Sequence, residues 1–221
     1  MAKRKISNPL ALAVLALLTE RPMHPYEMSS TMRERAKEES IKLNYGSLYS
    51  VVESLLRHNL IEVHETVREG KRPERTVYAI TDAGRTELVD WLSELFALPV
   101  KEFTQFEAAL SLMPVLPPEE VSRLLGTRRL RLEAEIVGTR AVLEEMTSRG
   151  MPYLFGIESD YAMTLREAEL RFVDRLLRQI EDGSLDGLDV WRRAHRTGEL
   201  PNEQDWARAA GWTQPKLRKV E

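Results

Sequence analysis

Residues 45–80, YGSLYSVVESLLRHNLIEVHETVREGKRPERTVYAI, decide the fold because their hydrophobic period changes once along the stretch. The first part has apolar residues at helical spacing, which predicts a helix from just after Asn44 to about His58. Residues 60–65 and 76–80 are rich in β-branched and aromatic residues, and a basic segment, residues 68–75, separates them. The second part therefore predicts a two-stranded hairpin with a basic turn. The residues expected on the buried face of the helix are Leu48, Val52, Leu55 and Leu56.

Helices are predicted on both sides of this stretch. Ser7-Asn8-Pro9 is typical of a helix start, and the apolar run that follows predicts a buried helix to about Leu18. A second helix is expected from His24-Pro25 to about Lys37. Thr81-Asp82 begins another, which reaches about Ala97. Three helices, a hairpin and a further helix follow one another in the order of a winged helix-turn-helix, so the fold class is mainly α with a small β-hairpin.

The rest of the chain also has helical patterns. A short helix is expected over residues 103–113, and two long helices over residues 117–150 and 155–180. The stripe on the first long helix is Val121, Leu125, Leu132, Ile136, Leu143 and Met146, and that on the second is Tyr161, Leu165, Ala168, Phe172, Leu176 and Ile180. One copy of each helix does not readily cover both stripes, which predicts a homodimer. Residues 182–221 are polar and are expected to be loosely organised.

Composition excludes several classes of protein. The chain has no cysteine, which removes disulfide frameworks, thiol catalysis and cysteine zinc sites and suits the cytoplasm. No nucleophile elbow, phosphate loop or HExxH motif is present, so we expect no enzyme, no cofactor and no metal site. The longest apolar run, residues 10–18, is too short to span a membrane.

The third helix and the hairpin turn together suggest DNA binding. Tyr45, Gly46, Ser47 and Tyr49 give the helix a small, polar start that could enter a major groove. Lys71 and Arg72, with Arg75 after them, give the turn cations for phosphate or minor-groove contact. Residues 1–80 hold 13 Lys+Arg against 10 Asp+Glu, whereas residues 81–221 hold 19 against 25, so the basic half is the one with this pattern. A winged helix that contacts only other proteins remains an alternative.

Five short blocks resemble the PadR-type family of transcriptional repressors. They are residues 22–28 (PMHPYEM), 46–49 (GSLY), 72–73 (RP), 77–78 (VY) and 81–84 (TDAG), in the family's order over about residues 8–97. The helical remainder resembles the longer branch of the family, whose C-terminal helices form the dimer. The resemblance divides the chain into a winged-helix DNA-binding domain (1–98), a helical dimerisation domain (99–182) and a polar C-terminal extension (183–221).

The resemblance implies a cytoplasmic homodimeric repressor that binds a pseudo-palindromic operator in double-stranded DNA and is released by a small aromatic effector. By matching positions, Tyr26, Ser47, Tyr49 and Arg72 would contact DNA. The family usually has glycine where Pro25 stands and proline where Tyr45 and Ser50 stand. Tyr45 and Ser50 change the surface that would face the groove, so the resemblance does not extend to the operator sequence.

Trp91 is the candidate contact for such an effector. It lies on the expected helix that joins the two halves, where a bound aromatic ring could stack on the indole and change the angle between them. Two other positions are open to this residue: the core of the first half, or the dimer interface.

Overall fold

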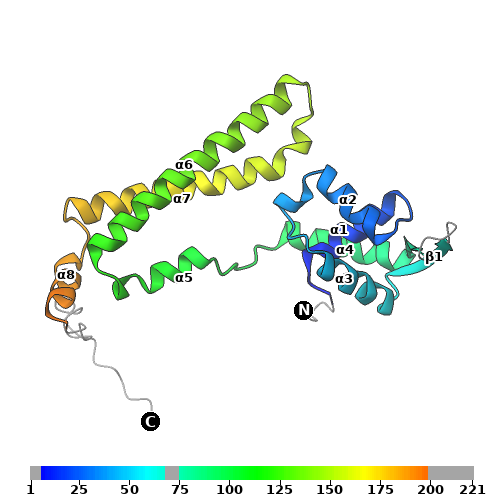
Figure 1. Ribbon diagram of the computed structural model, residues 1–221, viewed down its shortest axis with the longest axis horizontal. Coiled ribbons are helices and arrows are strands. Elements are labelled where there is room, and N and C mark those ends of the chain that lie inside the picture. Colours follow the sequence, from blue (N-terminus) through cyan, green and yellow to red (C-terminus); the bar gives the residue numbers. More distant parts are fainter. Residues whose placement is uncertain (1–5, 68–74, 199–221) are drawn as a thin grey trace, which may run out of the picture. The chain divides into compact units, whose positions relative to one another are not determined.

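The computed structural model describes residues 6–67 and 75–198, and the chain divides into two compact units, Met1–Glu102 and Phe103–Glu221. We call them the N-terminal unit and the C-terminal unit and describe each by itself (Figure 1). In the described part of the chain, no helix combines the length and the apolar character needed to cross a membrane.

The N-terminal unit is a winged helix-turn-helix, which confirms the predicted fold class. Its elements are α1 (Pro9–Glu20), α2 (Pro25–Glu34), the 3-10 turn η1 (Lys37–Glu39), α3 (Tyr45–Arg57), β1 (Ile61–Val67), β2 (Arg75–Ile80) and α4 (Asp82–Ala97). Most of α1 is buried, so the apolar run at residues 10–18 is a core helix as expected. The helix α2 ends three residues earlier than predicted, because Ala36 adopts a left-handed backbone conformation with φ of 51°.

One face of α3 is buried against this core. Leu48, Val52 and Leu55 are buried as the spacing predicted, but the fourth buried residue is Val51, and Leu56 is only half-buried. The buried face of α3 is thus rotated slightly from the predicted one. Periodicity alone does not distinguish Val51 from Leu56, because both lie at the edges of this face.

The hairpin is antiparallel and contains one irregularity. Val63 pairs with Tyr78 and Glu65 pairs with Val77, so His64 is an extra residue in β1 and forms a β-bulge. On the other side of β2, the backbone of Met23 pairs with that of Tyr78: each N–H donates to the other residue's carbonyl at 3.0 Å. The connection between α1 and α2 is thereby hydrogen-bonded to the hairpin.

The corner after α3 holds the end of the hairpin and the start of α4 together. Asn59 has a φ of 58°, and the N–H of Leu60 donates to the carbonyl of Leu55 at 3.0 Å, which is the pattern of a Schellman helix end. The carbonyl of Leu60 then accepts from the N–H of Thr81 at 3.1 Å. The Thr81 hydroxyl donates to the carbonyl of Asn59 at 2.8 Å and accepts from the N–H of Gly84 at 3.0 Å, so Thr81 caps α4 against this corner.

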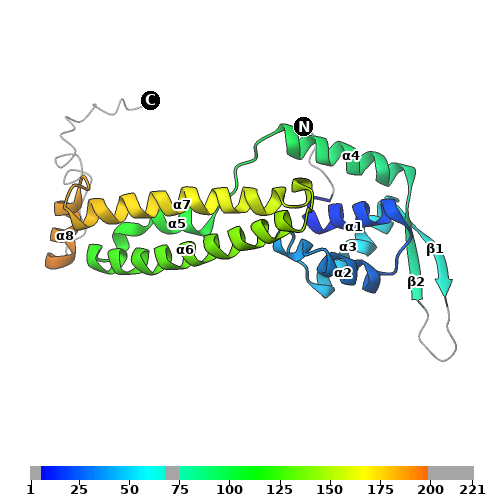
Figure 2. The ribbon, with the colours of Figure 1, turned by 90° about the horizontal axis from the view of Figure 1, so that it is seen from above.

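The C-terminal unit is helical throughout its described part. Its elements are α5 (Gln105–Ser111), the 3-10 turn η2 (Met113–Val115), α6 (Pro118–Ser148), the 3-10 turn η3 (Tyr153–Phe155), α7 (Ile157–Glu181) and α8 (Leu188–Thr197). The long helices α6 and α7 lie side by side as a hairpin (Figure 2). Phe106 of α5 packs edge-on against Phe172 of α7 with ring centroids 6.4 Å apart, and the guanidinium of Arg128 lies 3.8 Å from the centroid of the Phe106 ring.

Residues 188–197 correct the expectation of a loosely organised end. They form α8, whose apolar face is buried in the C-terminal unit with Leu188 and Trp191 in its core. The indole N–H of Trp191 donates to the carbonyl of Leu116 at 2.8 Å. The sequence looked polar here because α8 is short and strongly amphipathic, and its few apolar residues stand among charged ones.

Gly84 is required by close packing, and we predict that it does not tolerate a side chain. A Cβ at residue 84 would lie 2.0 Å from the carbonyl oxygen of Leu60, whereas one at Gly126, inside α6, would meet no atom within 4 Å. Gly84→Ala should lower the free energy of unfolding by about 3 kcal/mol through overpacking. Gly126→Ala, the matched control, should raise it by about 0.5–1 kcal/mol. Urea unfolding of the full chain measures both, and equal effects would contradict the packing argument.

Candidate nucleic-acid interface

The first turns of α3 present a small polar surface. Tyr45 is the first residue of the helix, and Ser47 and Tyr49 are exposed, Tyr49 to 47%. The side chain of Asn44 caps the helix by accepting from the N–H of Gly46 at 2.9 Å. Because the N-terminus of a helix carries partial positive charge and N–H groups without helical partners, an anion such as a phosphate is favoured there.

Tyr26 stands at the start of α2 and is 60% exposed, although a phenol usually packs at least one side. Its backbone is held on both sides: its N–H donates to Nδ1 of His24 at 3.0 Å, and its carbonyl accepts from the buried hydroxyl of Ser29 at 2.9 Å. The exposed ring therefore projects from a rigid backbone.

Arg75 is exposed at the beginning of β2, and the bridge between Met23 and Tyr78 brings this strand to the start of α2. Burial, and then the positive charge of Arg75, lower the pKa of the His24 imidazole below its ordinary value. Burial and the neighbouring Glu53 and Tyr49 raise the pKa of the Tyr78 phenol, which places Tyr78 beside α3. The start of α2, the exposed face of α3 and the start of β2 thus belong to one region of the N-terminal unit.

Two of the predicted contacts, Lys71 and Arg72, lie outside the described residues. Tyr26, Tyr45, Ser47, Tyr49 and Arg75 lie on the three elements that converge here. Ser50, which also faces outward, donates its hydroxyl to the carbonyl of Gly46 at 3.0 Å and so is engaged within its own helix.

Sequence reasoning missed His24 and Tyr78, which position the region. His24 caps α2: its N–H donates to the carboxylate of Glu27 at 3.0 Å while its ring accepts from the N–H of Tyr26. The signal was present, because a polar residue before proline, with glutamate three positions later, has the spacing of a capping box. The pairing of Tyr78 with Met23 gave no signal, since it joins residues far apart in the sequence.

Trp91 is placed in the core of the N-terminal unit, which is one of the three positions that the sequence allowed. Because its indole is only 5% exposed, it offers no face on which a second aromatic ring could stack. The structure therefore does not support the expected effector contact at this residue. Within residues 6–67 and 75–198, no group of three metal-ligating side chains is placed to hold an ion.

Comparison with known proteins gives one family and a consistent set of relatives. The model of the transcriptional regulator PadR-like family matches residues 14–90. The negative transcriptional regulator PadR of Bacillus subtilis (strain 168) is 23% identical over 146 residues, which cover 66% of this chain and 79% of that protein.

Solved structures extend the similarity beyond the winged helix. Bacillus subtilis PadR in complex with operator DNA matches with a TM-score of 0.61 and 20% identity, covering 80% of this chain and 99% of that one. The same protein in complex with p-coumaric acid matches with a TM-score of 0.61 and 19% identity, covering 78% of this chain and 98% of that one. The Vibrio cholerae virulence activator AphA matches with a TM-score of 0.56 and 16% identity, covering 78% of this chain and 98% of that one. At these identities the matches show a shared fold.

The cap at His24 predicts a pH dependence of stability. Folding lowers the pKa of His24 below the value of about 6.5 that it has in an unfolded chain, so the folded state favours the neutral ring. The neutral ring of His24 therefore contributes fully to the stability of the fold above about pH 6.5, and this stability is lost as the pH falls below that value. His24→Ser keeps an acceptor at the cap without a titrating group. The stability of this variant should fall less than that of the wild type between pH 7.5 and 5.5.

His24→Ala is the control, because it removes the acceptor at every pH and should cost about 1 kcal/mol at pH 7.5. Urea unfolding at several pH values measures all three proteins. If His24→Ser lost as much stability on acidification as the wild type, another group would be responsible for the loss.

Proposed function

Because residues 14–90 match the model of the PadR-like transcriptional regulator family, we propose that this chain is a sequence-specific DNA-binding repressor that acts as a homodimer. The family is one of transcriptional regulators rather than of enzymes. We place the protein in the cytoplasm, with double-stranded operator DNA as its partner and a small aromatic molecule as the effector that releases it.

The observation that carries the proposal is the division of α3 into two faces. Its rear face is buried through Leu48, Val52 and Leu55, so the helix is rigidly seated. Its front presents Ser47 and Tyr49 at the N-terminal end, where a helix that enters the major groove makes its base contacts. A serine hydroxyl bonds to either a base edge or a phosphate, and a tyrosine adds a hydroxyl and an apolar ring toward a thymine methyl.

The surrounding groups fit contacts to the DNA backbone. Tyr26 and Arg75 flank α3 on α2 and β2, and a phenol and a guanidinium both bond to phosphate oxygens. Lys71 and Arg72, which the sequence predicts in a basic turn, would extend these contacts along the duplex. Contacts of this kind set position and orientation, and those of α3 would select the sequence.

Dimerisation is supported by apolar side chains that the C-terminal unit leaves exposed on α6, η3 and α7. They include Leu130, Val137, Leu154, Ile157, Tyr161 and Leu165. Exposed apolar patches of this kind mark protein–protein contacts, and a second copy would cover them. A two-fold dimer would present two α3 helices to inverted half-sites, so the operator would be pseudo-palindromic.

Repression and release rest on what the relatives are named for. The Bacillus subtilis protein is a negative regulator, and its structure with p-coumaric acid contains a small aromatic molecule. The Vibrio cholerae protein is named an activator, so the fold serves both directions of control. We propose repression because the sequence relative is a negative regulator.

We predict that Ser47→Ala and Tyr49→Ala mainly reduce specific binding. Each should cost about 1–3 kcal/mol on the operator and less on random DNA, because base contacts are lost only on the operator. Gel shifts on the region upstream of the chain's own gene, with competitor DNA, measure this. Arg149→Ala, on the C-terminal unit, is the control and should leave both affinities unchanged. Equal losses on both DNAs would mean that the two residues only position the protein, and no shift at all would favour a protein-interaction module.

We predict that a chain ending at Pro99 is largely monomeric, because it lacks α6 and α7 with their exposed apolar residues. Without the second copy, only one half-site is engaged at a time, so the operator affinity should fall far below that of the full chain. Sedimentation velocity gives the oligomeric state and gel shifts give the affinity. A truncated chain that stayed dimeric and bound tightly would assign dimerisation to the N-terminal unit.

A further inference from the structure

The helices α6 and α7 bury apolar side chains against each other near the start of α6 and the end of α7, which we call the closed end. Near the turn that connects them, which we call the open end, almost no residue is buried. At the closed end, Leu125 and Leu132 of α6 are buried with Val173 and Leu177 of α7. Between residues 137 and 172, all of them within the described part of the chain, Gly156 is the one buried residue. Both predicted apolar stripes continue into this segment, so apolar residues are present there. None of these stripe residues is buried.

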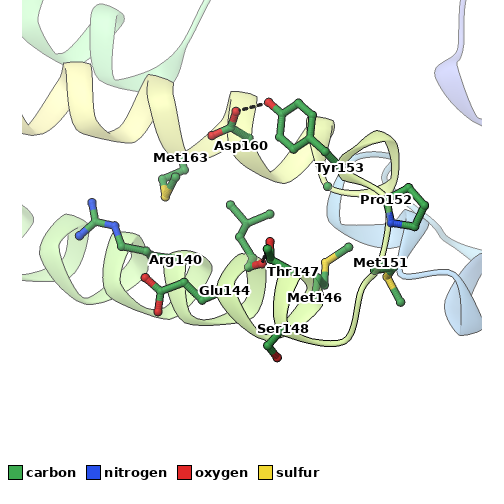
Figure 3. Close-up of a pocket in the computed structure, with 12 residues that line it drawn as sticks. Arg140, Glu144, Met146, Thr147, Ser148, Met151, Pro152, Tyr153, Asp160 and Met163 are labelled. Carbon is green, nitrogen blue, oxygen red and sulfur yellow. Dashed lines mark hydrogen bonds between the residues drawn. The ribbon is translucent and has the colours of Figure 1, made fainter.

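A cavity of about 490 Å³ lies at the open end, between the last turns of α6, the connection through η3 and the first turns of α7 (Figure 3). Its apolar wall consists of Leu143, Met146, Met151, Pro152 and Met163. The volume falls in the range of small-molecule sites. Methionine side chains are flexible and polarisable and make favourable contacts with aromatic rings, so the wall suits an aromatic guest.

Gly156 forms part of the cavity wall. A Cβ at this position would lie 3.0 Å from Cδ2 of Leu143 and 3.8 Å from Cε of Met146. The backbone of α7 thus comes close to α6 just beside the cavity, and the space is bounded by backbone as well as by flexible side chains.

The polar groups of the wall give the cavity an acidic character. The Tyr153 hydroxyl donates to Oδ2 of Asp160 at 2.5 Å, and this bond raises the pKa of the tyrosine. Glu144 lies on the α6 side of the cavity. The one cation of the wall, Arg140, donates from Nη2 to Oε1 of Glu167 at 2.8 Å, and Glu167 is not among the lining residues. With Arg140 paired to Glu167, the wall carries two carboxylates, Glu144 and Asp160.

We propose that this cavity binds a small aromatic molecule carrying a cationic amine, with the ring among the methionines and the amine at Asp160, while Glu144 adds negative charge on the opposite wall. An amine donates to carboxylates and balances their charge, whereas a carboxylate on the guest would be repelled by them. The assignment of this molecule as the effector rests on the proposed function, but its binding does not, so binding is measured without DNA.

Three probes with one carbon skeleton test the charge: 4-phenylbutylamine, 4-phenylbutanol and 4-phenylbutyrate. Carbon-13 methyl labelling of the eight methionines reports where each probe binds to the full chain. The amine should shift Met146, Met151 and Met163 saturably and leave Met23, Met28 and Met32, which are buried in the N-terminal unit, unmoved. The alcohol should bind about tenfold more weakly, because a hydrogen bond between two charged groups is stronger than one to a neutral group.

Two isosteric variants test the residues. Asp160→Asn and Glu144→Gln keep the shape of the wall. Asp160→Asn should weaken the amine about tenfold, and Glu144→Gln should weaken it less because its charge acts across the cavity, while both leave the alcohol unchanged. Glu145→Gln is the control, because Glu145 pairs with Arg149 and does not line the cavity. The proposal is overturned if no cavity methionine shifts, if the butyrate binds as well as the amine, or if Glu145→Gln weakens the amine as much as Asp160→Asn does.

Discussion

The arrangement of the N-terminal unit depends on two backbone hydrogen bonds between Met23 and Tyr78, each 3.0 Å long. They join the connection between α1 and α2 to the edge of the hairpin through an isolated β-bridge. Since Met23 is buried, these bonds form away from water, where leaving either amide unpaired would be costly. They set the start of α2, which carries His24 and Tyr26, beside the start of β2, which carries Arg75.

The same region shows how stability and function share one set of residues. A helix can present a polar face rigidly only if its other face is held, and α3 is held by fully buried leucines at positions 48 and 55. The corner at Asn59 and Leu60 lies between the end of α3 and the start of the hairpin. Thr81, which caps α4, donates hydrogen bonds to the carbonyls of both corner residues. The residues that would face DNA are therefore held in place by residues that are buried in the core.

The C-terminal unit follows a different principle, because its long hairpin is packed over only part of its length. Its closed end is completed by α5, through Phe106, and by α8, through Trp191. Its open end keeps exposed apolar residues such as Leu154 and Tyr161 beside an acidic cavity. Surface left unburied by one chain is available to a second chain or to a ligand.

By itself, the sequence determined the local structure of this protein: the helix starts at Asn8, Asn44 and Thr81, the change of period at the hairpin, and the polar start of α3. These features depend on neighbouring residues, whose preferences can be recognised along the chain. Only the tertiary structure decided that Trp91 is a core residue, that residues 188–197 form a helix, and that the stripes of α6 and α7 are not buried toward the turn. Each of these depends on contacts between residues distant in the chain, and an apolar periodicity shows that a face will be buried but not what will cover it.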